Sequence, residues 1–109
     1  MSAVEELDAG SLHELLLTEG RGVLIDFWSP WCGPCRILRP HLHKLAEERD
    51  ADWRFVAINT DEHPSVATDF GVSALPTLVM CRNGEELSRL SGAVTLASLV
   101  ETLDEFTAS

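Results

Sequence analysis

The stretch Val23-Leu-Ile-Asp-Phe-Trp-Ser-Pro-Trp-Cys-Gly-Pro-Cys35 places two thiols shortly after an apolar run. The apolar run is interrupted once, by Asp26, and a run of this length predicts a central strand covered on both faces. From Cys32 onward the apolar residues recur with helical spacing past Pro40. The sequence therefore predicts a strand that passes into a helix at two cysteines separated by two residues.

Two thiols at the start of a helix are placed for chemistry more than for packing. The first N–H groups of a helix are unpaired, and this end carries partial positive charge. A thiol there ionises more readily, and the thiolate is the nucleophile in thiol–disulfide exchange, which is the predicted reaction of Cys32 and Cys35. The alternatives are a structural disulfide and a zinc site that adds Cys81 and His41 or His43, but this spacing matches no standard zinc pattern.

Length and composition predict one domain that spans residues 1–109. With 18 acidic and 8 basic residues the net charge is −10, which argues against binding to nucleic acid or to an anionic membrane. The apolar runs are too short to cross a bilayer, and the acidic N-terminal segment has no export signal. One close cysteine pair and a single further cysteine suit a reducing compartment, so a cytoplasmic location is expected.

The rest of the chain alternates between strand and helix patterns. Ser11 and Glu14 match a capping box for a first helix that ends at Gly20 and Gly22. Asn83-Gly84 is typical of a two-residue hairpin turn. The predicted elements are strands at Val4–Leu7, Val23–Trp28, Trp53–Asn59, Thr77–Cys81 and Glu85–Leu90, and helices that start at Ser11, at the dithiol, at Pro64 and at Thr95.

This order, β-α-β-α-β-α-β-β-α, predicts an α/β fold with a five-stranded sheet and four helices. The initial alternation implies parallel strands with right-handed crossovers, and the hairpin adds an antiparallel edge. Asp26 would then lie inside the protein, in a central strand. A buried carboxylate is costly unless it is paired or protonated, so this residue needs an explanation.

The dithiol stretch and several distant segments together resemble the thioredoxin family. Phe27-Trp-Ser-Pro-Trp-Cys-Gly-Pro-Cys35 is similar to the family's active-site sequence. The resemblance implies the thioredoxin fold, with a central mixed sheet, and a protein-disulfide reductase that needs no bound cofactor beyond its redox-active disulfide. The likeness continues at Asp26, Asn59-Thr-Asp61, Ala74-Leu-Pro-Thr77, Asn83-Gly84 and Gly92-Ala93.

The two cysteines and Asp26 are the expected catalytic residues. Cys32 precedes the predicted helix and should be the exposed nucleophile, whereas Cys35 lies one turn in, on the core face, and should be the resolving thiol. The resemblance implies that Asp26 accepts a proton from Cys35; the alternative is a carboxylate without a catalytic part. Many family members pair this carboxylate with a lysine where this chain has Ala57. We therefore expect burial to raise the pKa of Asp26 with little Coulombic relief.

A docking surface for the substrate is implied around the dithiol. Pro76 resembles the family's cis-proline, whose backbone pairs with the bound substrate chain. The third cysteine, Cys81, is interpreted as a small buried hydrophobe rather than a redox group. The other residues that fall where the family builds its apolar docking surface are Trp31, Gly33, Pro34, Leu75, Gly92 and Ala93.

The implied partners are protein disulfides as substrates and a thioredoxin reductase that restores the dithiol. That reductase would be an NADPH-dependent flavoenzyme or a ferredoxin-linked enzyme, and the default oligomeric state is a monomer. A disulfide oxidase or isomerase is the alternative within the same chemistry, although Gly33-Pro34 between the cysteines resembles reductases. The alternative from another class is a non-catalytic binding or accessory module with the same fold and apolar surface.

Overall fold

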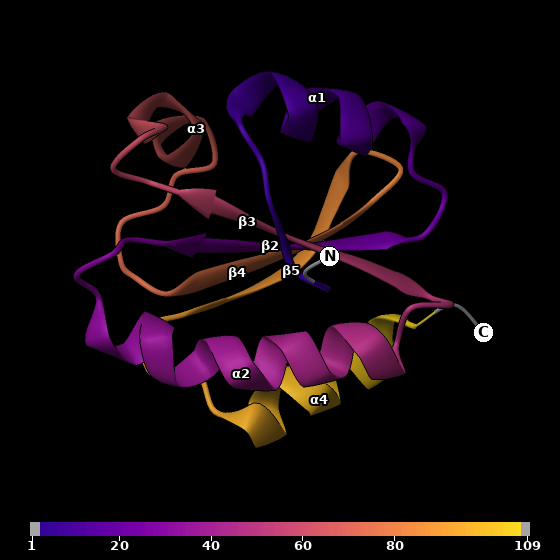
Figure 1. The fold of residues 1–109 in the computed structure, drawn as a ribbon. Helices are drawn as coiled ribbons and strands as arrows, with labels where there is room; N and C mark the ends of the chain where they lie inside the picture. Colours follow the sequence, from indigo (N-terminus) through magenta and orange to yellow (C-terminus); the bar gives the residue numbers. More distant parts are fainter. Residues whose placement is uncertain (1–2, 108–109) are drawn as a thin grey trace.

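The computed structural model describes residues 3–107, so both ends of the predicted domain lie outside the described residues. Its strands are β1 (Glu5–Glu6), β2 (Gly22–Trp28), β3 (Trp53–Asn59), β4 (Thr77–Arg82) and β5 (Glu85–Ser91). They form one sheet in the order β1-β3-β2-β4-β5 (Figure 1). β1, β2 and β3 are parallel, whereas β4 is antiparallel to β2 and β5 is antiparallel to β4. The predicted mixed sheet is therefore confirmed.

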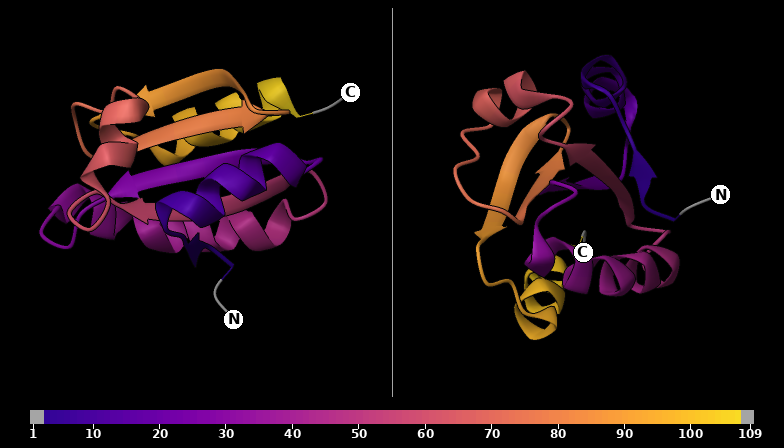
Figure 2. Two further views of the ribbon diagram at one scale, coloured as in Figure 1. Left: turned by 90° about the horizontal axis from the view of Figure 1, so that it is seen from above. Right: turned by 60° about the vertical axis from the view of Figure 1, so that its left-hand side comes forward.

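Helices cover both faces of the sheet. α1 (Ala9–Thr18) and α3 (Pro64–Asp69) lie on one face, and α2 (Gly33–Glu48) and α4 (Leu96–Phe106) lie on the other (Figures 1 and 2). The order of helices and strands is the predicted one, and Thr95 caps α4 as expected. Across residues 3–107, no helix has the length and apolarity that crossing a membrane requires.

The central strand β2 divides the core into two halves. Ile25 packs in the cluster that includes Leu12 of α1, whereas Leu24 packs in the cluster that includes Leu38 of α2. Because successive side chains of a strand point to opposite faces, Asp26 faces the same side as Leu24. The alternation of side chains along β2 thus places the Asp26 carboxyl on the face of the sheet that α2 and α4 cover.

The first helix begins earlier than the capping-box pattern predicted. Its N-cap is Asp8, whose Oδ1 accepts a hydrogen bond of 2.8 Å from the backbone N–H of Ser11. Ser11 therefore lies within the first turn, and the prediction that it caps the helix is wrong. Both residue types suit an N-cap; Asp8 takes the position because the chain is still extended there, at φ −93° and ψ 177°.

The glycine at position 22 belongs to β2 and not to the end of α1, which ends at Thr18. Gly22 and Trp53 are Cα partners in the pairing of β2 with β3. A Cβ on Gly22 would lie 2.6 Å from atoms of the Trp53 ring, whereas a Cβ on Gly20 would meet no atom within 4 Å. A close approach to an aromatic ring, and not the end of a helix, therefore requires glycine here.

Candidate functional site

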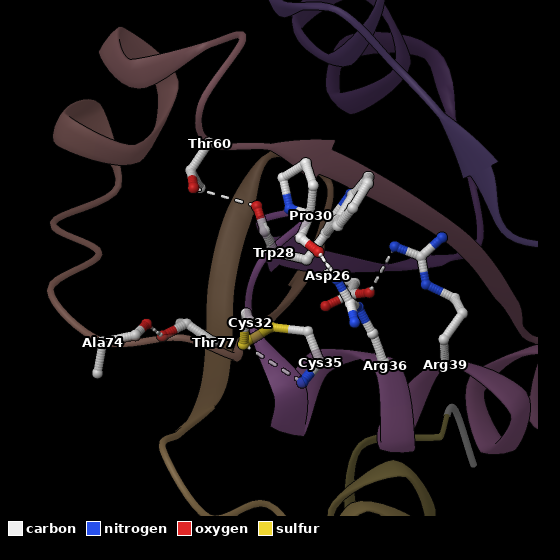
Figure 3. The surroundings of a disulfide bond; sticks show 10 residues. All are labelled: Asp26, Trp28, Pro30, Cys32, Cys35, Arg36, Arg39, Thr60, Ala74 and Thr77. Atoms are coloured by element: carbon white, nitrogen blue, oxygen red, sulfur yellow. Dashed lines mark hydrogen bonds and ion pairs between the residues drawn. A yellow bond between two sulfur atoms is a disulfide. The ribbon is translucent and has the colours of Figure 1, made fainter.

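The dithiol lies where the chain leaves β2 and enters α2. Cys32 is the N-cap of α2, and Pro34 stands in the first turn, where its missing N–H costs no hydrogen bond. Cys32 and Cys35 form a disulfide with their Cα atoms 5.3 Å apart. The backbone N–H of Cys35 also donates to the Cys32 Sγ over 3.3 Å (Figure 3). A helix N–H that already points at this sulfur would also stabilise its thiolate.

Both cysteines are nearly buried in this disulfide form. Cys32 retains 7 % of its surface and Cys35 retains 4 %. The expectation that Cys32 is exposed is therefore wrong for this form, because its sulfur turns back over the first turn of α2 to reach Cys35. The expected order of the two residues still holds, since Cys32 caps the helix and Cys35 lies on its core face.

The segment before β4 brings Pro76 to the dithiol end of the sheet. The Leu75–Pro76 peptide bond is cis, as the resemblance implied. The hydroxyl of Thr77 donates to the Ala74 carbonyl over 2.6 Å, which braces this turn. The N–H of Gly92 donates to the Pro76 carbonyl over 2.9 Å. One hydrogen bond thus joins two segments of the predicted docking surface.

An apolar groove of about 270 Å³ runs from the first turn of α2 to the start of α4. It includes four of the predicted docking residues, and it extends past them to Ile37, which is 74 % exposed, and to Leu96. This extension was not predicted from the sequence, because both residues also fit an apolar helix face. The groove is lined by Pro34, Ile37, Leu38, His41, Pro76, Gly92, Ala93, Val94 and Leu96.

The remaining predicted docking residues lie outside the lining of that groove. Trp31 is 72 % exposed, and its Nε1 donates to the Asp61 carboxylate over 2.8 Å, which fixes the ring at the surface. Gly33 is exposed in the first turn of α2. Leu75 lines a separate hollow that also contains Thr60. Asp61 had no role assigned from sequence, although a carboxylate can accept from any exposed indole nearby.

Asp26 is 1 % exposed in the central strand. Its Cα partners are Ala57 on β3 and Leu78 on β4, so neither neighbouring strand offers it a cation. Loss of hydration disfavours the charged carboxylate, and burial raises the pKa of Asp26 to about 7. The predicted direction and main cause of this shift are supported by the structure.

Coulombic relief for Asp26 comes from α2 and not from a strand. Arg39 places its Nη2 3.2 Å from the Asp26 Oδ2 (Figure 3). This guanidinium lowers the pKa of Asp26 against the larger effect of burial, while the nearby Glu6 carboxylate raises it further. The expectation of little relief is therefore wrong. The neighbouring strands place no cation beside Asp26, but the long Arg39 side chain extends to it from α2.

The third cysteine is far from this chemistry. Cys81 is buried in β4 and unpaired, and burial raises the pKa of its thiol to about 11. A thiol with such a pKa stays protonated at neutral pH and is a poor nucleophile. Its interpretation as a small buried hydrophobe is supported. Within residues 3–107, no cluster of three or more His, Cys, Asp or Glu side chains could hold a metal ion.

The chain is similar to thioredoxins in sequence and in fold. A sequence model of the thioredoxin family matches residues 3–105. A thioredoxin of Pyropia yezoensis is 36% identical over 104 residues, which are 95% of this chain and 97% of that protein. A thioredoxin of Synechocystis sp. is 35% identical over 106 residues, 97% of this chain and 99% of that protein. Oxidised mitochondrial thioredoxin 3 of Saccharomyces cerevisiae superposes with a TM-score of 0.86 at 30% identity, over 97% of this chain and 100% of that chain.

The raised pKa of Asp26 makes stability depend on pH. The carboxyl has a pKa of 3.8 when hydrated and about 7 when folded, so between these values the unfolded chain releases a proton that the folded protein keeps. Stability should therefore fall by about 1.4 kcal/mol per pH unit across this window. Asp26→Asn should remove that slope, so that its advantage over wild type grows with pH and levels off above the folded pKa.

Urea unfolding of the oxidised proteins at several pH values measures this difference. Asp69→Asn is the matched control, since Asp69 is an exposed carboxylate on α3. A constant difference between Asp26→Asn and wild type across the window would contradict the raised pKa.

Proposed function

The chain belongs to the thioredoxin family, and from that premise we propose that it reduces protein disulfides with Cys32 as the attacking thiol and Cys35 as the resolving thiol. Members of this family are thiol–disulfide oxidoreductases. The single observation that carries the assignment of roles is the disulfide at the N-terminus of α2, with Cys32 as the N-cap and Cys35 inside the first turn.

The proposed reaction proceeds in two exchanges. The Cys32 thiolate attacks one sulfur of the substrate disulfide, which forms a mixed disulfide and releases the first substrate thiolate. Cys35 then loses its proton and attacks the Cys32 Sγ, which releases the second substrate thiolate and leaves the Cys32–Cys35 disulfide. Two electrons pass from the dithiol to the substrate, and each released thiolate takes up a proton.

Asp26 is the proposed acceptor of the Cys35 proton. A general base works best when its pKa is close to the working pH, and burial brings the pKa of Asp26 to about 7. A cavity of about 180 Å³ is lined by Cys35 and by Arg39, the ion-pair partner of Asp26, together with Trp28 and Arg36. Such a space has room for the water that would carry a proton between carboxylate and thiol.

The substrate chain is proposed to dock on the surface around the dithiol. The exposed Trp31 and the groove beside Pro76 supply apolar contact area, while the cis peptide bond turns the backbone of the Pro76 segment. Gly33, Pro34, Leu75, Gly92 and Ala93 complete the proposed surface. Backbone pairing with an extended peptide would supply affinity without demanding one sequence.

The proposed setting is that of a single-domain, monomeric cytoplasmic thioredoxin without a bound cofactor. Thioredoxin family members act with thioredoxin reductases, and here the reductase would be an NADPH-dependent flavoenzyme or a ferredoxin-linked enzyme.

Removing the resolving thiol separates catalysis from mere binding. Cys35→Ser should abolish turnover of insulin disulfides and accumulate a mixed disulfide on Cys32, because nothing remains to attack that sulfur. Cys81→Ala is the matched control and should turn over like wild type. Mass spectrometry of the trapped species together with an insulin-reduction assay measures both effects. A wild-type protein that reduces no insulin disulfides would instead favour the binding module.

A charge in the groove should weaken docking of proteins but not the thiol chemistry. Ala93→Asp should lower kcat/KM for insulin by about tenfold, because a carboxylate in an apolar contact must lose its hydration. Turnover of a small aromatic disulfide should stay unchanged. Leu17→Asp is the control, since Leu17 is also an exposed apolar residue but lies on α1, away from the groove. Equal losses in both variants, or with both substrates, would count against the docking surface.

A further inference from the structure

Arg39 is held at the buried end of the dithiol site by three neighbours. Its Nη2 lies 3.2 Å from the Asp26 Oδ2, and its Nη1 lies 3.7 Å from the Glu6 Oε2. Its Cζ stacks 4.9 Å from the centroid of the Trp28 ring. The Trp28 Nε1 in turn donates to the same Glu6 oxygen over 3.1 Å. These contacts leave the Arg39 side chain 24 % exposed and fix where its charge lies.

The position of Arg39 on α2 connects it to the resolving thiol. It follows Cys35 by four residues, and residues four apart lie on the same face of a helix. Both side chains line the cavity of about 180 Å³ described above. Figure 3 shows the Arg39 guanidinium pointing toward the Asp26 carboxylate from the helix that carries Cys35.

No strand side chain can take over this contact. The Cα partners of Asp26 on both sides, Ala57 and Leu78, are apolar. Neither Asp26 oxygen has a hydrogen-bond partner among the described residues, so its charged form depends on the ion pair with Arg39. An unpaired buried carboxylate would stay protonated and could not accept a proton.

We propose that Arg39 is a positioning residue of the redox site, which holds the Asp26 carboxylate ionised and thereby ready to accept the proton of Cys35. The Glu6 carboxylate of β1 opposes it, because it draws on the same guanidinium and repels the charge on Asp26. Against the effect of burial, the balance between the Arg39 cation on α2 and the Glu6 anion on β1 then adjusts the pH at which Asp26 becomes a base. This inference rests on the proposed role of Asp26 and names the group that controls it.

Carbon-13 NMR titration of the Asp26 carboxyl in the oxidised protein tests the proposal, because Cys32 and Cys35 do not titrate in that form. Arg39→Met keeps the aliphatic packing but removes the charge, and should raise the titration midpoint by about one pH unit or more. Arg39→Lys keeps the charge and should stay nearer to wild type. Glu6→Gln should move the midpoint downward. Arg36→Met should leave the midpoint unchanged, because Arg36 contacts the Pro30 carbonyl and not Asp26.

A rescue experiment separates the charge of Arg39 from a purely structural role. Ala57 is the Cα partner of Asp26 and packs in the same half of the core as Leu24, so a lysine there should reach the carboxylate. The double variant Arg39→Met/Ala57→Lys should bring the midpoint back toward that of wild type. Loss of packing around Trp28 would not be repaired by this second change.

The pH profile of the second exchange step supplies an independent readout. In Arg39→Met the rate at which Cys35 attacks the mixed disulfide should rise at higher pH than in wild type, by the same displacement as the NMR midpoint. An unchanged midpoint in Arg39→Met, or no rescue by the lysine, would overturn the proposal. A displaced midpoint with an unchanged pH profile of the rate would support the effect of the ion pair on Asp26. It would contradict the proton-accepting role of Asp26 instead.

Discussion

Desolvation of the Asp26 carboxyl is the constraint on which the proposed chemistry of this protein depends. β2 lies between β3 and β4 and is covered by helices on both faces, and this cover removes water from the one carboxyl that the strand contains. Because side chains alternate along the strand, the Asp26 carboxyl faces α2, the helix whose N-cap is Cys32. The fold therefore places a carboxyl with a pKa of about 7 on the face of the sheet that α2 covers, and its burial costs stability at neutral pH.

Three segments that are distant in sequence meet at the dithiol. The end of β2 and the first turn of α2 supply the sulfurs, the cis-proline segment lies before β4, and the Gly92 turn precedes α4. The hydrogen bond between Gly92 and Pro76 joins the last two. Helix polarity acts on the thiols, and all three segments contribute to the proposed docking surface, so that binding and electron transfer would occur at one end of the sheet.

The sequence predicts those parts of the structure that depend on local pattern. The apolar run of β2, the dithiol at a helix start and the Asn83-Gly84 turn, with φ of 55° and 77°, are set by neighbouring residues and were found as expected. Asp8 and Ser11 both suit the N-cap of α1. Asp8 is the N-cap because the extended backbone ends at that residue. The requirement for Gly22 and the cation beside Asp26 depend on side chains that reach across from other elements. A pattern read along the chain contains no signal for such contacts.

The proposed role of Asp26 is to accept the proton that Cys35 loses during the second exchange. Stopped-flow release of the second thiolate from a small aromatic disulfide measures this step directly in wild type and in Asp26→Asn. We predict a wild-type rate constant that rises with pH through a midpoint near the folded pKa of about 7, and a rate constant at least about tenfold lower, without that midpoint, in Asp26→Asn. Identical rate constants and pH profiles in the two proteins would contradict the account.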